Sequence, residues 1–246
     1  MVNIRRIVLG LILFFTLCML NSENGSSQAS PAIIILSPGQ GSVVTSPIHF
    51  SAALVPGEDD LVRVTLIDQN GQLLVRQLSR WAPQADPQAP FTTELVYEIP
   101  NESAQGLITV ETQDKHHRPM TLRGVLLTLQ NSGQTQLQAS SEQEPWINII
   151  SPQPYEFFSS GKFAIKGTAK PITTKPIIFE LITETGGVIG SKQLAVDNPG
   201  ESMSFEVPLS YSFITSTREV RLVMRQTVDP YGENIVLDSL PLFITP

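Results

Sequence analysis

The chain has 246 residues, of which 41% are hydrophobic and 16% are charged, and this balance excludes an intrinsically disordered protein. Its 19 prolines and 16 glycines leave few uninterrupted stretches that are long enough for a helix, which favours an all-β fold. A formal net charge of −7, with basic residues spread singly along the chain, argues against binding to nucleic acid.

Residues 1–29 have the pattern of a secretory signal peptide. Arg5 and Arg6 precede an apolar run over residues 7–20, and a polar stretch follows the run. The run is shorter than the roughly 20 apolar residues that a membrane-spanning helix needs, so we expect cleavage. Residues 25–27 and 27–29 both have a small-x-small pattern, and we choose the second, which is closer to A-x-A and places the cleavage after Ala29. The protein is therefore expected to be exported, and to be extracellular or associated with the cell envelope.

Cys18, the only cysteine of the chain, lies inside this apolar run. Acylation of Cys18 would make a lipoprotein, but Leu17 stands where a lipobox has a small residue. Contact with a membrane is expected only through the leader, if the leader is retained or lipidated. The residues after the leader contain no cysteine, and the lack of disulfides favours a bacterial protein over a secreted eukaryotic one.

The first half, residues 30–129, contains a series of predicted short strands. It opens with an apolar strand that stops at Ser37-Pro38, continues with alternating residues over 48–52, and then forms a hairpin around Gly71. Further strands are predicted over residues 93–99, 107–113 and 121–129.

Residues 130–145 separate this half from a second half, residues 146–246. The segment contains no aromatic or β-branched apolar residue and cannot bury a core, so it is predicted to be a flexible polar linker. The second half repeats the order of the first, because its Ser-Pro strand lies 114 residues later and Gly186 lies 115 residues after Gly71. Its later strands are predicted over residues 163–167, 177–189 as a hairpin, 203–209, 219–226 and 235–244, where Pro241 implies a sheet edge or a break.

The repeat predicts the fold. About seven short strands in about 100 residues, with turn signals every 8 to 12 residues, are typical of an immunoglobulin-like sandwich. Each half gives the same strand order independently. We therefore predict an all-β protein with two tandem immunoglobulin-like β-sandwich domains, residues 30–129 and 146–246.

Short motifs in the second half carry a family resemblance. An apolar strand that ends in Ser-Pro is followed by an alternating strand that ends in Gly167-Thr168-Ala169, and then by a Glu/Asp-x-x-Gly hairpin. These motifs resemble the immunoglobulin-like domain of bacterial spore germination proteins, which also occurs in other envelope proteins; the first half has Ser51-Ala52-Ala53 instead. The resemblance implies an extracytoplasmic accessory module without catalytic residues. It does not imply sporulation, because the second functional domain of the germination proteins is not visible here.

Searches for catalytic, cofactor-binding and metal-binding patterns give no assignment. The chain lacks the Gly-x-Ser-x-Gly elbow, the His-Glu-x-x-His pair and the phosphate-binding glycine loop, so no catalytic residue, cofactor or metal is predicted. Asp114 with His116 and His117 could bind a transition metal, although a solvated loop is the preferred interpretation. Acidic turns, rather than Ca²⁺ sites, are preferred at Asp59-Asp60 and at residues 229–234.

Two aromatic residues are the candidate contact residues. Trp81 lies in a proline-rich stretch without strand periodicity, and Tyr155 lies in an early loop of the second half beside Phe157 and Phe158. Exposed rings at these places could stack on sugars or anchor a protein partner. The alternative is that the rings fold over the end of a core, which is the preferred interpretation for Phe157 and Phe158.

These observations favour a non-enzymatic structural or interaction protein: an envelope-associated binding, adhesion or spacer module. Its partner is expected to be an unidentified envelope protein or polysaccharide. The second hypothesis is a carbohydrate-binding module, which a row of coplanar exposed aromatic rings would favour. The third is an enzyme without a recognisable motif, which a concave pocket with two carboxylates about 5 to 9.5 Å apart would favour.

Overall fold

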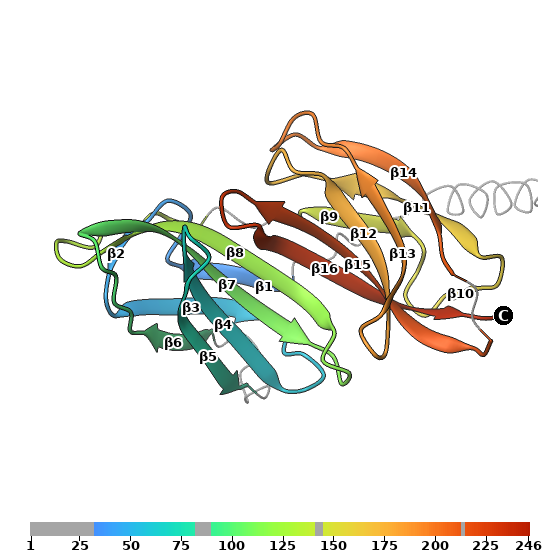
Figure 1. Cartoon of the computed structure of the whole chain (residues 1–246), viewed down its shortest axis with the longest axis horizontal. Coiled ribbons are helices and arrows are strands. Elements are labelled where there is room, and N and C mark those ends of the chain that lie inside the picture. The colour runs from blue at the N-terminus through green and yellow to red at the C-terminus, as the bar shows by residue number, and fades with distance from the viewer. Residues whose placement is uncertain (1–31, 82–89, 141–144, 213–214) are drawn as a thin grey trace, which may run out of the picture.

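A computed structural model describes residues 32–81, 90–140, 145–212 and 215–246 (Figure 1). Sixteen strands form the regular structure of these ranges. In the described ranges, no helix is long and apolar enough to cross a membrane. The predicted leader, with Cys18 and the cleavage site after Ala29, lies outside the described residues, as do residues 82–89 of the proline-rich stretch.

The first half forms two facing antiparallel sheets. The smaller sheet has the order β1-β3-β6, and the larger one has the order β5-β4-β7-β8, with β2 added in parallel to β8. Period-two alternation produces this arrangement: Val62, Val64 and Leu66 of β4 point into the sandwich and are fully buried. The strands are β1 (Ile33–Ser37), β2 (Val43–Thr45), β3 (Ile48–Leu54), β4 (Leu61–Asp68), β5 (Leu73–Arg80), β6 (Phe91–Leu95), β7 (Ser103–Gln113) and β8 (Pro119–Gln130).

The second half repeats this topology strand for strand. Its smaller sheet has the order β14-β11-β9, its larger sheet has the order β13-β12-β15-β16, and β10 lies parallel to β16. Strand order and pairing in both halves are those of an immunoglobulin-like sandwich, so the predicted all-β immunoglobulin-like fold is confirmed. The strands are β9 (Ile147–Ser151), β10 (Phe157–Phe158), β11 (Lys162–Ala169), β12 (Ile177–Thr183), β13 (Val188–Leu194), β14 (Met203–Ser210), β15 (Arg218–Val228) and β16 (Glu233–Ile244).

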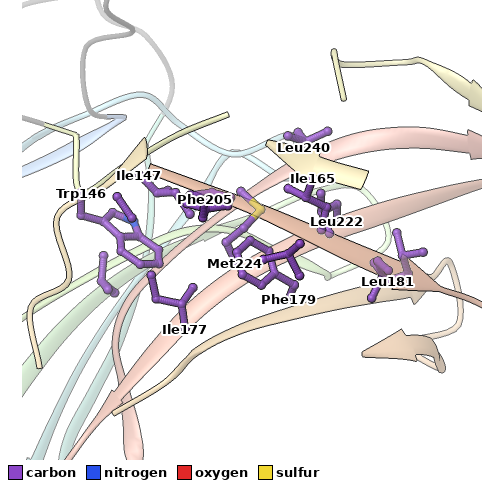
Figure 2. Packing of buried hydrophobic residues seen from close by; sticks show 14 of the residues in the cluster. Trp146, Ile147, Ile165, Ile177, Phe179, Leu181, Phe205, Leu222, Met224 and Leu240 are labelled. Atoms are coloured by element: carbon purple, nitrogen blue, oxygen red, sulfur yellow. The ribbon is translucent and has the colours of Figure 1, made fainter. Parts of the chain in front are cut away.

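Each half encloses a hydrophobic cluster between its two sheets. The first is centred on Phe50 and the second on Phe179, and both side chains are fully buried. Figure 2 shows the second cluster, in which the Trp146 ring lies among residues from both sheets, Ile147 and Ile177 included. Burial of one side chain of this size stabilises the fold by about 1.5–3 kcal/mol. The second cluster also includes Ile67 and Leu107 of the first half, so it extends across the boundary between the halves.

The two larger sheets join into one continuous sheet along β8 and β16 (Figure 1). The strands run antiparallel, and Leu122 pairs with Leu237 while Arg123 pairs with Val236. An offset of 115 residues relates Leu122 to Leu237, Arg123 to Asp238 and Thr121 to Val236. Exchange of the two halves therefore leaves the Leu122–Leu237 pair in place and converts the Arg123–Val236 pair into the Thr121–Asp238 pair. The halves are therefore related by an approximate twofold axis through this junction, which is called the seam below.

The described part of the predicted linker lies against the first half. The backbone N–H of Val43 donates to the carbonyl of Gln136 at 2.9 Å, and the N–H of Gln136 donates back at 2.8 Å. The N–H of Gln138 donates to the Ser42 hydroxyl at 2.9 Å, and the same turn brings Gly39 so close to the Gln138 carbonyl that a side chain would clash. The expectation of a freely flexible linker is thus wrong for residues 131–140. Separate folding of the two halves stays a prediction.

Pro241 does not break β16, which runs through it to Ile244. The Tyr155 N–H donates to the Pro241 carbonyl at 2.7 Å, so this side of Pro241 faces away from β15. On that side β16 pairs with β8 only over residues 236–238 and with β10 only over residues 243–244. Proline is tolerated here because the backbone N–H that it lacks would point to the side of β16 where no strand of the described ranges pairs with residue 241.

Candidate interaction surface

A buried charged cluster fixes the seam on one face of the sheet. The Asp114 carboxylate is fully buried and accepts hydrogen bonds from Arg118 Nε at 2.7 Å and from Arg221 Nε at 3.0 Å. Arg118 Nη2 also donates to Glu219 at 2.6 Å, and Arg221 Nη1 donates to the Ser239 hydroxyl at 3.0 Å. Because Asp114 and Arg118 come from the first half and the other three residues from the second, the cluster ties the halves together.

The cluster corrects the interpretation of residues 114–118 as a solvated loop. Asp114 and Arg118 are buried, whereas His117 is exposed and has a left-handed φ of 61°. Asp114 is occupied by the two arginines and by the backbone N–H groups of His116 and Arg118. Within the described ranges, no group of three or more His, Cys, Asp or Glu side chains could hold a metal ion.

The acidic turns also carry basic partners. Asp59 lies 2.6 Å from the Arg63 guanidinium, and its other oxygen accepts the Leu61 N–H at 3.0 Å. Asp229 lies 2.7 Å from Lys175 Nζ. Both carboxylates therefore have local roles in turns, as the preferred interpretation of these segments predicts.

The pH dependence of stability should report on Asp114. Burial tends to raise the pKa of this carboxyl, but the hydrogen bonds from Arg118 and the charges of Arg118 and Arg221 outweigh burial, so its pKa lies below the ordinary 3.8. The resulting stabilisation is complete above the ordinary pKa and is lost as the pH falls through the depressed one. Urea midpoints of the wild type and of Asp114→Asn should therefore differ by a constant amount down to about pH 5 and converge below it. A difference that persists unchanged to about pH 2 would contradict this assignment.

A second polar contact lies on the other face of the seam. Asp238 of β16 accepts hydrogen bonds from Arg123 Nη2 at 2.8 Å and from the Trp146 indole Nε1 at 2.7 Å. Arg123 also donates to the Leu122 and Leu237 carbonyls. Trp146 is buried at the start of the second half, so its side chain joins the second core to the seam.

Three aromatic rings gather at the surface far from this seam contact, where β10 meets the end of β16. The Phe157 and Phe243 rings stack with centroids 4.7 Å apart and planes 16° apart, and the Tyr155 ring lies 6.4 Å from Phe243 with a tilt of 36°. The exposed fractions of Tyr155 and Phe157 are 59% and 63%. These three residues are called the aromatic patch below.

The backbone fixes the patch firmly. Tyr155 has a left-handed φ of 65°, and its N–H donates to Pro241, while the Phe243 N–H donates to the Glu156 carbonyl at 2.9 Å. Alternation along β10 then sends Phe157 outward and Phe158 inward, where the Phe158 ring stacks on Phe163 with centroids 4.3 Å apart. The expectation of a ring over the core is therefore confirmed for Phe158 and is wrong for Phe157.

Trp81 lies elsewhere, directly after β5 in the first half. Its N–H donates to the Asp60 carbonyl at 2.8 Å, and its ring meets Phe91 edge to face with centroids 5.6 Å apart. The side chain is half-buried and packs on the rim of the first core. The structure thus places the two candidate contact residues, Trp81 and Tyr155, in different halves and does not bring them into one site.

Replacement of Trp81 by alanine should have a modest effect on stability. Half-burial and one ring contact predict a loss of about 1–2 kcal/mol in the free energy of unfolding, below the 3–5 kcal/mol of a fully buried tryptophan. Urea denaturation of the variant measures this loss. A loss of about 4 kcal/mol would show that Trp81 is a core residue and would remove it as a contact candidate.

Two surface depressions test the enzyme hypothesis. One, of about 560 Å³, is lined by His49 and Glu94, and the other, of about 240 Å³, lies between Asp229, Tyr231 and first-half residues. Each contains a single acidic residue, so neither of these depressions brings together the two carboxylates that glycoside hydrolysis requires.

Sequence reasoning missed Phe243, Trp146 and the charged cluster. Phe243 was detectable in principle, because Leu240, Leu242 and Ile244 set the inward phase of the strand and place an aromatic residue at an outward position. The arginines of the cluster carry no such signal, because Arg118 lies outside the strands and Arg221 alternates with the core residues Val220 and Leu222, which gives it the phase of a surface residue. Their partners come from the other half, since Arg118 donates to Glu219 and Arg221 donates to Asp114.

No protein-family model matches the chain, and no curated protein matches it. Among solved structures, it is similar to the ICAM-5 D1–D4 ectodomain fragment, with 15% identity over 86% of this chain and 53% of the fragment and a TM-score of 0.25. It is also similar to extracellular domains 3–5 of Drosophila OTK, with 13% identity over 88% of this chain and 67% of that one and a TM-score of 0.24. The chain spans about half the length of the ICAM-5 fragment. The immunoglobulin-like assignment rests on the strand order of each half.

Proposed function

We propose that this chain is an exported, non-enzymatic interaction protein of the bacterial cell envelope, which binds another envelope protein through the aromatic patch. The observation that carries the proposal is the exposure of Tyr155 and Phe157 on a backbone that is held by hydrogen bonds to β16. Large exposed rings on a fixed backbone are typical anchors of protein interfaces, because they bury much apolar area at little cost in conformational entropy.

Two features of the sequence support export and the envelope. Residues 1–29 have the pattern of a signal peptide, and the Ser-Pro and Gly167-Thr168-Ala169 motifs resemble the immunoglobulin-like domain of spore germination proteins and other envelope proteins. The absence of cysteine after Cys18 agrees with a bacterial module that is stabilised by its core alone.

A carbohydrate ligand is the second candidate, because Tyr155 and Phe157 are exposed rings. Sugar-binding platforms use rings that offer parallel free faces. Here one face of Phe157 is covered by Phe243, and the Tyr155 ring is tilted by 36° to the Phe243 ring. This geometry favours a protein partner.

A comparison of variants tests the proposal. The tagged chain from residue 30 onward is used to capture partners from envelope extract, alongside the double variant Tyr155→Ser/Phe157→Ser. The matched control is Val55→Ser/Leu78→Ser, because these side chains are exposed to 63% and 58% but lie in the first half. The patch variant should capture at least about tenfold less of a specific partner than the unchanged chain, as expected for hot-spot residues. The control variant should capture as much of that partner as the unchanged chain does. Equal capture by all three proteins would refute the patch as the binding surface.

In a second arm of this experiment, the same three proteins are sedimented together with envelope polysaccharide that contains no protein. Binding to the polysaccharide that the patch variant loses and the control keeps would establish the carbohydrate ligand instead of a protein.

A further inference from the structure

Strand β2 of the first half is covered on its outer side by another segment of the chain. The Ser42 carbonyl accepts the Thr128 N–H of β8 at 2.9 Å, so the following residue, Val43, turns its N–H and C=O away from β8. Both groups pair with Gln136, at 2.9 and 2.8 Å, in an antiparallel bridge. Thr135 adds a hydroxyl contact to Thr45 at 3.0 Å. An extended polar segment thus completes this edge.

Strand β10 has the same geometry without the cover. The Glu156 carbonyl accepts the Phe243 N–H of β16 at 2.9 Å, so the N–H and C=O of Phe157 face away from β16. An offset of 114 residues relates Phe157 to Val43. Among the residues that the structure describes, none pairs with this outer side of Phe157. Within the described ranges, the edge that is paired in the first half is therefore unpaired in the second.

We propose that an extended segment of a partner protein pairs antiparallel with the outer side of β10, as the Gln136 segment pairs with β2. Backbone pairing supplies the attachment, and the side chain opposite Phe157 falls on the same face as its ring. Because Phe157 and Tyr155 line that face and are more than half exposed, the partner residue at this position is aromatic or aliphatic. This inference rests on the proposed function and specifies how the aromatic patch is occupied.

A partner segment fits this edge better than a second copy of the chain. Each copy carries a formal charge of −7, so two copies repel one another. The strand also offers only two residues, Phe157 and Phe158, which suits a single bridge to a flexible peptide better than a sheet between two folded bodies.

A random library of twelve-residue peptides displayed on phage, selected against the full chain from residue 30 onward, provides the probe. Selected peptides are synthesised, and amide hydrogen exchange of the chain is followed by NMR. The Phe157 amide should exchange rapidly in the free chain and become protected in the complex, whereas the Val43 amide should be protected in both. N-methylation of the peptide residue opposite Phe157 should weaken binding by about tenfold, because it removes one backbone donor without changing the protein.

The outcomes separate this inference from the proposed function. Peptides that lose affinity for Tyr155→Ser/Phe157→Ser but leave the Phe157 amide unprotected would support recognition by the patch and overturn the strand pairing. A library that yields no peptide protecting Phe157 would overturn the pairing, while capture from envelope extract still tests the patch. Dimerisation of the chain with protection of Phe157 would place a second copy on β10 and would also overturn the inference.

Discussion

Replacement of Asp114 by alanine is expected to lower the free energy of unfolding by about 3–5 kcal/mol, one of the two largest effects of a single substitution in this chain. The carboxylate is fully buried and faces Arg118 and Arg221, which are each exposed by only 2%. Its removal leaves both guanidinium groups in a desolvated position with only part of their partners, Glu219 and Ser239 among them. Urea denaturation of the chain from residue 30 onward measures the loss.

The repeat supplies a matched control for this substitution. Asp229 follows β15 directly, as Asp114 follows β7, but its partner Lys175 and its own side chain are exposed. Asp229→Ala should therefore cost no more than about 1 kcal/mol, the usual range for an exposed ion pair. Equal losses for the two variants would show that the charged cluster contributes nothing beyond an ordinary surface pair.

Replacement of Trp146 by alanine is expected to cost about 3–5 kcal/mol. The ring is buried in the second hydrophobic cluster (Figure 2). Its Nε1 donates to Asp238 at 2.7 Å. The substitution leaves a cavity in the core and removes one donor from a carboxylate that also holds Arg123. The loss should exceed that of Trp81→Ala by at least about 1 kcal/mol, since both variants remove the same side chain from sites of different burial.

A variant that keeps the ring separates the two contributions. Trp146→Phe retains most of the packing and loses only the hydrogen bond to Asp238, so it should cost about 1.5–3 kcal/mol. A Trp146→Ala loss as small as that of Trp81→Ala would contradict the burial of Trp146 in the second hydrophobic cluster.

The strands were predictable from the sequence because their signals are local. Alternation in residues 48–52 and 62–66 follows from one side facing a core, and Gly71 and Gly186 adopt the left-handed φ that their hairpin turns require. Strand β10 was not predictable in this way, because two residues are too few to show a period. The predicted strand over residues 93–99 ends early, at Leu95, although Tyr97 and Ile99 continue to point into the core.

The seam could not be predicted from either half alone. Arg221 has the outward phase of β15, whereas Arg123 shares the inward phase of Val125 and Leu127 on β8. The acidic partners of both arginines, Asp114 and Asp238, come from the other half. The candidate site was predictable in part, since Tyr155 was recognised from its loop. Phe243, 88 residues later, joins it only through the parallel pairing of β10 with β16.

The central claim is that two immunoglobulin-like halves form one rigid body that presents the aromatic patch. The chain from residue 30 onward contains no cysteine, so spin labels can be attached at cysteines introduced in place of the exposed residues Glu102 and Glu201, one in each half. Electron–electron double resonance should give a single narrow distribution of distances between the two spin labels. This distribution should broaden in the Asp114→Ala variant. A broad distribution in the otherwise unchanged chain would contradict the seam and with it the rigid arrangement of the two halves.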